Sequence, residues 1–215
     1  MRGHGCLRMG RKKGYEREAL VASALGVFHR QGFKGASTEV LVRELGVNRN
    51  SVYSEFGSKE GLFAAALSHY DALVVSQLFG PLEAQSANLD DIATLFHVFS
   101  ESVSASIGLG CLMCNTAAEL GGNDPDLQPS IDRYFERLHI AFSNALSGAV
   151  RDGQISNDTA IGMEARFLTS CCLGIFLMVR AGIGISAAQD AVRGALNHLG
   201  LLRRSGFGHA ASGTA

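Results

Sequence analysis

The feature that most constrains the fold of this chain is the helical spacing of its apolar residues, which recurs along most of its 215 positions. Apolar side chains return every third or fourth residue, as they do on the buried face of an amphipathic helix. Nowhere is the apolar–polar alternation that is typical of strands sustained, and only three prolines interrupt the chain. The pattern therefore predicts an all-α protein, and a hydrophobic content of 47% is enough to build a sizeable core.

Capping residues and glycines divide the chain into a series of helices. The side-chain oxygens of Ser37, Asn48 and Ser58 can cap three successive helices. Gly80-Pro81 should stop the last of these, since proline lacks the backbone donor that a helix interior needs. The expected helices run from Leu20 to Gly32 and then over residues 38–45, 49–56, 59–79, 89–103, 111–120, 124–152, 158–181 and 186–202.

Positive charge is concentrated at the N-terminal end. Residues 1–60 carry 11 Lys or Arg against 6 Asp or Glu, whereas residues 61–215 carry 8 against 14. Residues 1–13 contain no acidic residue, so we expect a flexible basic arm, including Lys12, that is attracted to a polyanion. A solvated leader without function is the alternative for residues 1–10.

Cysteine usage and hydropathy indicate a cytoplasmic protein without a membrane partner. The longest charge-free apolar run, residues 167–179, is too short to cross a bilayer and suits a buried helix. No apolar segment follows the first basic residues, as it would in a secretory signal. Five cysteines, an odd number, do not form the disulfide framework of a secreted domain.

Residues 38–45, Gly46-Val47 and residues 49–56 predict two short helices joined by a tight turn, which is the helix-turn-helix arrangement. In that arrangement the second helix places its first turn against base edges in the DNA major groove. Arg49 can bond two acceptors of guanine and Asn50 can bond adenine, each with about 1–3 kcal/mol of discrimination. The segment therefore predicts sequence-specific binding of double-stranded DNA.

Tyr53 and Lys59 suit phosphates rather than bases, because a phenol and an ammonium can bond the DNA backbone and Lys59 opens the following helix. Phosphate contacts set affinity, and base contacts set sequence preference. The complete set of expected DNA-binding residues is Lys12, Ser37, Thr38, Asn48, Arg49, Asn50, Ser51, Tyr53 and Lys59.

Over these residues the chain resembles the TetR family of bacterial one-component regulators. The resemblance is specific over about residues 15–63 and looser beyond them. Two positions depart from the family pattern: Glu55 stands where a His is frequent, and Asn50 where a small residue is frequent. The first departure removes one phosphate contact, and the second implies a different base preference. The matching stretches are Gly32-Phe33-Lys34-Gly35-Ala36-Ser37, Leu41-Val42, Gly46-Val47 and, above all, Val52 to Leu62.

The resemblance implies a homodimer that binds a palindromic operator and a small-molecule effector. Residues 14–58 would form the DNA-binding domain, residues 59–204 the ligand-binding and dimerisation domain, and residues 205–215 a disordered tail. The regulator would be a repressor, with a ligand-independent regulator or an activator as alternatives. The two last helices would pair with those of the partner through Phe167, Leu168, Cys172, Ile175, Phe176, Val179, Val192, Ala195, Leu196 and Leu199.

Gly110-Cys111-Leu112, followed by Asn115 and Glu119, resembles a branch of the same family. Some members of that branch respond to oxidants or electrophiles through such a cysteine. A thiol at a helix N-terminus forms thiolate more readily, so Cys111 is a candidate sensor. The competing interpretation is that Cys111 is a small buried hydrophobe.

Other uses of the Cys-x-x-Cys spacing are weaker. A thioredoxin-like enzyme needs a βαβ context that the helical pattern lacks, and a zinc site needs two further ligands from outside the motif. No catalytic order of residues or phosphate-binding loop supports an enzyme, so we expect no catalytic residue, no metal and no cofactor.

A ligand cavity among the later helices is expected from aromatic and half-polar side chains. Helical spacing alone also places such residues in an ordinary core. A helical protein that binds small molecules or acts through thiols, without DNA binding, is the alternative from another functional class. The candidates for the cavity are Tyr70, Phe96, Phe99, Cys111, Asn115, Tyr134, Phe135 and Met178.

Overall fold

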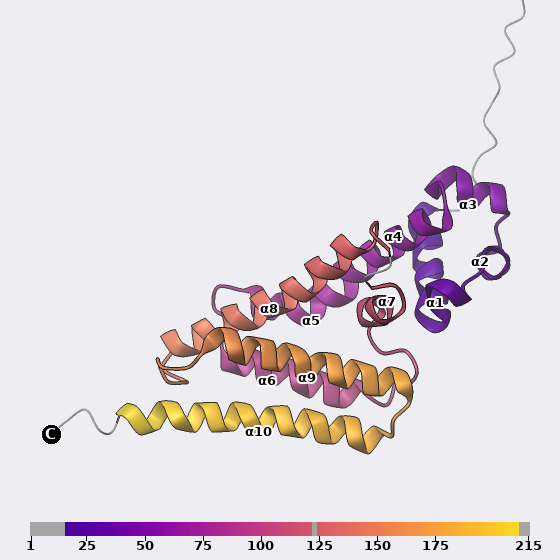
Figure 1. Ribbon diagram of the computed structural model, residues 1–215. Helices are drawn as coiled ribbons and strands as arrows, with labels where there is room; N and C mark the ends of the chain where they lie inside the picture. The colour runs from indigo at the N-terminus through magenta and orange to yellow at the C-terminus, as the bar shows by residue number, and fades with distance from the viewer. Residues whose placement is uncertain (1–15, 122–123, 211–215) are drawn as a thin grey trace, which may run out of the picture.

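The computed structural model describes residues 16–121 and 124–210, and side chains beyond Arg203 are not described. Within these ranges the chain is helical and contains no strand, as the apolar spacing predicts. Figure 1 shows a small head at one end of an elongated bundle, and the C-terminus lies at the opposite end. The expected arm, including Lys12, and residues 211–215 of the expected tail lie outside the described residues.

The head consists of α1 (Arg17–Gly35), α2 (Thr38–Leu45) and α3 (Arg49–Phe56). The three predicted caps are confirmed, because the side chains of Ser37, Asn48 and Ser58 accept bonds from the backbone N–H of Val40, Ser51 and Gly61. Phe28, Leu41 and Val52 are buried and anchor one helix to the next. The predicted break at Gly32 is also present, as a non-helical residue between the body of α1 and its last turn.

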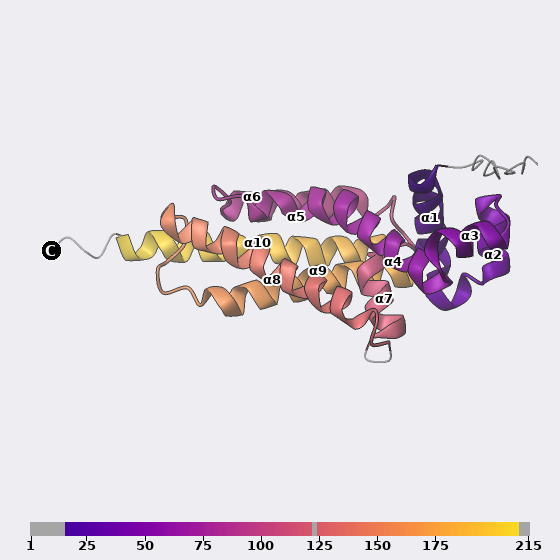
Figure 2. The ribbon, with the colours of Figure 1, turned by 90° about the horizontal axis from the view of Figure 1, so that it is seen from above.

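A long helical path connects the head to the bundle (Figures 1 and 2). It passes through α4 (Lys59–Tyr70), the π-helical turn η1 (Asp71–Val75) and α5 (Ser76–Glu83). The expected stop at Gly80-Pro81 is wrong, since Pro81 lies inside α5 and the helix ends after Glu83. Phe79 and Leu82 are buried on either side of the proline, so tertiary packing holds this turn in helical form.

The bundle is completed by α6 (Leu89–Ser102), α7 (Leu112–Leu120), α8 (Gln128–Arg151), α9 (Ile161–Ala181) and α10 (Ile185–Ala210). The apolar stripe predicted for α6 is buried in the core. Helices α8 and α9 start three or four residues later than expected. Helix α10 continues past residue 202, so the expected disorder from Ser205 is wrong for residues 205–210.

Two helical stretches, Lys59–Glu83 and Ile161–Ala181, are long and apolar enough to cross a membrane by length and composition alone. Core helices of soluble proteins pass the same test, so this is weak evidence for a span. In the structure Lys59–Glu83 packs against helices of the head and of the bundle, and Ile161–Ala181 packs against α7, α8 and α10.

Candidate nucleic-acid interface and ligand cavity

The turn between α2 and α3 presents the first turn of α3 at the tip of the head. Gly46 adopts the left-handed conformation that ends α2, with φ 63° and ψ 23°. Asn48 caps α3 through its side-chain oxygen, which lies 2.8 Å from the backbone N of Ser51. Asn48, Arg49 and Asn50 are exposed, and Ser51 is half-buried. The residues predicted to read bases therefore lie together at the surface.

Three polar side chains from α2 and α3 form a cluster beside this turn. The guanidinium of Arg49 lies over the ring of Tyr53, 5.2 Å from its centroid, and Arg49 Nη2 lies 3.5 Å from Tyr53 Oη. Tyr53 Oη is 3.4 Å from Thr38 Oγ1. Hydrogen bonding to Thr38 and Arg49 lowers the pKa of the Tyr53 hydroxyl. The cluster gives the head neighbouring donors that suit phosphate oxygens.

Lys59 and Glu55 have roles in packing the head. Lys59 Nζ lies 4.2 Å from the ring centroid of Phe33, and partial burial lowers the pKa of this amine. Glu55 Oε1 is 3.3 Å from Arg17 Nε, and the Arg17 guanidinium also lies over the ring of Phe56. Glu55, which departs from the family pattern, thus joins α3 to α1.

Glu119 of α7 holds the kink of α1. Its carboxylate accepts bonds from the backbone N–H of Phe33 at 2.9 Å and of Lys34 at 2.6 Å. The break at Gly32 exposes these donors, and a carboxylate is a strong acceptor for them. In the sequence Glu119 is marked only as part of a motif, because its partners lie more than 80 residues away in the chain.

A second junction between head and bundle involves His29 of α1. His29 Nε2 lies 2.9 Å from the carbonyl oxygen of Gly110. Arg180 Nη1 donates to the carbonyl oxygens of His29 and Gly108, at 3.0 and 2.9 Å. Asn115 Nδ2 donates to the Leu109 carbonyl at 2.7 Å and so holds the same loop. No local sequence signal marks His29 or Arg180.

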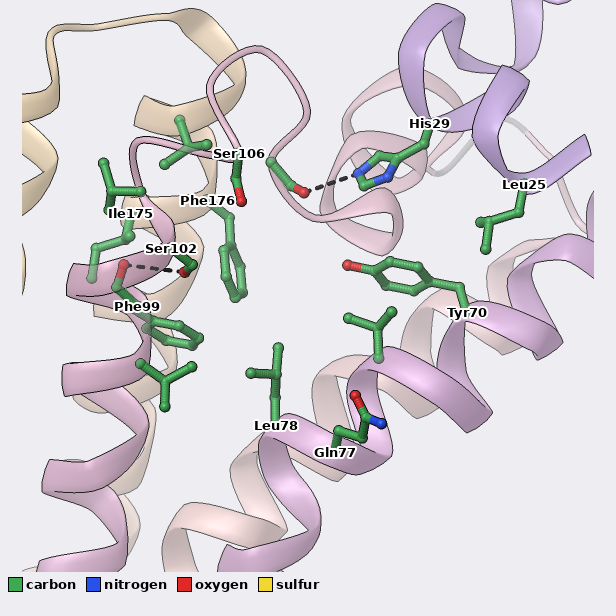
Figure 3. Close-up of a pocket in the computed structure, with 15 residues that line it drawn as sticks. Leu25, His29, Tyr70, Gln77, Leu78, Phe99, Ser102, Ser106, Ile175 and Phe176 are labelled. Atoms are coloured by element: carbon green, nitrogen blue, oxygen red, sulfur yellow. Dashed lines mark hydrogen bonds between the residues drawn. The ribbon is translucent and has the colours of Figure 1, made fainter. Parts of the chain in front are cut away.

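A cavity of about 360 Å³ lies beneath this second junction, between α1, α4 to α6, α9 and the loop after α6 (Figure 3). Tyr70 directs its hydroxyl toward the centre, and the rings of Phe99 and Phe176 stand opposite. The lining residues are Leu25, His29, Tyr70, Val74, Gln77, Leu78, Val98, Phe99, Ser102, Val103, Ser106, Gly110, Ile175, Phe176 and Val179.

The structure brings only Tyr70 and Phe99 of the predicted cavity residues into this cavity. Phe96 is fully buried in the core beside Phe99 and Phe142. Asn115 and Phe135 line an open groove on another side of α7, while Tyr134 and Met178 each line a further one. Periodicity identified the aromatic residues as buried but could not say which cavity they would face.

Cys111 is the N-cap residue of α7 and is only 3% exposed. Its Sγ lies 3.2 Å from Tyr134 Oη, and Cys114 Sγ lies 3.9 Å from the same hydroxyl. Burial raises the pKa of the Cys111 thiol, but hydrogen bonds from Cys114, Tyr134 and Tyr70 outweigh burial and lower this pKa to about 6. The low exposure favours a packing role for Cys111.

The expected dimer residues divide into two groups. One group is buried within the single chain and belongs to its own core: Leu168, Cys172, Val179, Val192 and Leu199. Ile175 and Ala195 are also buried, but they line a groove between α9 and α10. Phe167 is 44% exposed, and Phe176 and Leu196 are partly buried. The helical spacing of apolar residues predicted that the last two helices are apolar. It did not predict which side of each helix the core would cover.

One exposed apolar stripe remains on α9 and α10. A groove between these helices is lined by Phe167, Cys171, Gly174, Met178, Ala191, Gly194, His198 and Leu201, together with three neighbours. His198 Nε2 lies 2.6 Å from Glu164 Oε2, and the rings of His198 and Phe167 are in contact. Among the described residues, no group of three or more His, Cys, Asp or Glu side chains is placed to hold a metal.

Comparisons with known proteins identify the family. Residues 20–66 match the model of the bacterial regulatory proteins of the tetR family, and residues 88–195 match a tetracyclin repressor-like C-terminal domain. The chain is 29% identical to the uncharacterized HTH-type transcriptional regulator YezE of Bacillus subtilis, over 86% of this chain and 96% of that protein. It is 26% identical to the HTH-type transcriptional repressor ComR of Escherichia coli, over 82% and 85%.

Solved structures share the fold. A cysteine mutant of the TetR family regulator CifR, complexed with 26bp double-strand operator DNA, has a TM-score of 0.74 at 24% identity, over 87% of this chain and 98% of that one. Reduced NemR of Escherichia coli has a TM-score of 0.70 at 23% identity, over 86% and 96%. With both domains matched in order along the chain, this protein belongs to the TetR family of bacterial regulatory proteins.

Proposed function

We propose that the protein is a transcriptional regulator that binds operator DNA as a homodimer and is released by a small molecule, without an enzymatic step. The observation that carries the proposal is the exposed first turn of α3, where Arg49 and Asn50 lie at the tip of the head. The membership of the family and the repressor ComR among the relatives support it.

The position of the head supports contact with a long duplex. Both views place α2 and α3 at the end of the molecule opposite the C-terminus, so DNA can approach without meeting the bundle (Figures 1 and 2). The cluster of Thr38, Tyr53 and Arg49 supplies phosphate donors beside the base-reading turn.

The apolar stripe on α9 and α10 supports the homodimer. Phe167 and Leu201 are 44% and 58% exposed, although both are large apolar residues. Gly174 and Gly194 lie between them and would let helices of two subunits approach closely. A two-fold dimer presents two copies of α3, which implies a palindromic operator.

Release by a ligand requires that the ligand bind more tightly to the form that does not fit DNA. The cavity in the bundle meets the head at His29, so its occupant would contact both domains. A coupling free energy of about 1–3 kcal/mol is typical and would weaken operator binding several-fold to a hundredfold.

The DNA-binding proposal is tested by selecting duplexes from a random library with the full chain and titrating the selected duplex by fluorescence anisotropy. Arg49→Ala should weaken binding of that duplex by about 1–3 kcal/mol and relax the preference at one base pair. Lys59→Gln should weaken all duplexes alike and reduce the salt slope by about one unit.

Arg151→Ala is the matched control, because Arg151 is an exposed arginine at the end of α8, far from the head. It should bind the selected duplex as the unmodified protein does. Selection of no duplex, or an affinity that does not fall as salt rises, would refute the proposed function.

A further inference from the structure

The cavity beneath the second junction contains no charged wall. None of its fifteen lining residues is Asp, Glu, Lys or Arg. The side chains of Leu25, Leu78, Phe99 and Phe176 give it apolar surfaces on several sides (Figure 3). A charged molecule would lose its hydration there without gaining an opposite charge from any lining residue, which costs several kcal/mol.

His29 and Tyr70, the titratable residues of the lining, are also uncharged near neutral pH. Burial lowers the pKa of the His29 imidazole, and the nearby charge of Arg180 lowers it further. Burial raises the pKa of the Tyr70 hydroxyl far above its ordinary value. Near neutral pH the cavity therefore offers uncharged hydrogen-bonding groups, including the hydroxyls of Ser102 and Ser106.

The polar end of the cavity coincides with the contact between the two domains. His29 lies on α1 of the head, and its ring donates to Gly110 in the loop of the bundle. Arg180 is outside the lining and joins the backbone of His29 to that of Gly108. His29 and Gly110 both line the cavity, so a molecule that fills its polar end lies against the contact that Arg180 reinforces.

We infer that the cavity takes an uncharged, mostly apolar small molecule, and that this molecule changes DNA binding through the junction of His29, Gly110 and Arg180. The inference rests on the proposed function and deepens it, since it specifies the chemistry of the ligand and the contacts that carry its effect to the head.

The ligand class is tested with two fluorescent probes that share a skeleton. N-phenyl-1-naphthylamine is neutral, and 8-anilinonaphthalene-1-sulfonate adds one negative charge to a similar ring system. The neutral probe should bind this site saturably and at least about tenfold more tightly than the sulfonate probe, because only the sulfonate must give up the hydration of a charge.

A blocking variant assigns the signal to the cavity. Ser102→Phe fills it from α6, and the matched control Thr94→Phe adds the same ring at an exposed position of α6 outside the lining. Only Ser102→Phe should abolish binding of the neutral probe. Equal affinity of the two probes for the site that Ser102→Phe blocks, or no signal that depends on Ser102, would overturn the ligand class.

The route to the head is tested by measuring the affinity of the neutral probe with and without saturating selected duplex. In the unmodified protein the duplex should lower the affinity for the probe by about fivefold or more, which is the ratio of the affinities measured without and with duplex. Arg180→Met should leave the affinity of the free protein for the probe unchanged but bring the ratio close to one. Arg166→Met, on the exposed side of the same helix, should keep the ratio.

A ratio of one in the unmodified protein, or an unchanged ratio in Arg180→Met, would overturn the route. These outcomes differ from failure of the proposed function. If no duplex were bound at all, the regulator proposal would fail, while the two probes would still decide the ligand class in the free protein.

Discussion

Single residues at the boundary of head and bundle have little freedom to change. Gly32 adopts φ 72° and ψ 177°, a region that is open almost only to glycine. A Cβ atom at this position would lie 2.6 Å from Oε2 of Glu119. The backbone conformation and the carboxylate contact therefore require each other, because the break in α1 frees the donors that Glu119 binds.

Gly32→Ala should lower the free energy of unfolding by about 1–3 kcal/mol through backbone strain alone. Displacement of the Glu119 carboxylate should add to this loss. Gly46→Ala is a control for positive φ alone, because Gly46 lies in the less restricted left-handed region and a Cβ there would meet no atom within 4 Å. Denaturant titration of both variants measures the difference. A loss at Gly32 no larger than the loss at Gly46 would contradict both the special backbone region of Gly32 and the cost of displacing Glu119.

His29 predicts a pH dependence of stability. Its pKa is lowered in the folded protein by burial, which the Gly110 and Leu109 carbonyls partly offset, and by the charges of Arg180 and Arg30. The unfolded chain therefore takes up this proton more readily, so stability should fall as pH falls through about 6.5.

His29→Gln keeps a donor for the Gly110 carbonyl but cannot titrate. As pH falls from about 7.5 to about 5.5, the unmodified protein should lose free energy of unfolding relative to this variant. The pH range follows from the reference pKa of histidine. Parallel curves for the two proteins would contradict the lowered pKa of His29.

At the scale of helices, local signals located the starts that carry a capping side chain, but placed several other starts and ends three or more residues away. The capping side chains of α2, α3 and α4 were predicted correctly, since a cap depends on residues within three positions of it. Pro81 did not end α5, because the buried side chains of Phe79 and Leu82 outweigh the missing backbone donor. Packing against distant helices is invisible in the local sequence.

Helix α7 should hold α1 through Glu119. Glu119→Ala removes an ionised acceptor from two backbone donors, and such bonds contribute about 1.5–3 kcal/mol each. The amides of Phe33 and Lys34 should therefore exchange with solvent at least about tenfold faster. Glu136→Ala, an exposed glutamate of α8, is the control and should leave both amides unchanged. Unchanged exchange in Glu119→Ala would mean that α7 does not hold the kink.

At the scale of the whole molecule, the last two helices, α9 and α10, serve two purposes. Leu168, Cys172 and Val192 face the core of their own chain, while Phe167 and Leu201 stay exposed. A monomer that leaves such a stripe uncovered favours a partner, and an identical stripe on a second copy is complementary to it in a two-fold arrangement.

Phe167→Glu should convert the proposed dimer to monomers, because two glutamates would be buried close together across the two-fold axis. Sedimentation velocity at micromolar concentration measures the change, and affinity for a palindromic duplex should fall with it. Ile140→Glu alters an apolar residue of α8 that is 55% exposed, against 44% for Phe167, and should remain dimeric. A monomeric unmodified protein, or a dimeric Phe167→Glu variant, would refute the interface.

The all-helical class, the helix-turn-helix and its capping residues followed from the sequence, because these features depend on residues a few positions apart. Apolar spacing also identified the core of α6 correctly. Only the tertiary structure decided which faces of α9 and α10 remain exposed, which aromatic residues line the cavity, and how His29, Glu119 and Arg180 join the head to the bundle. The hydrogen bonds of His29, Glu119 and Arg180 connect residues separated by 72 to 151 positions, so their formation depends on how the helices pack against one another.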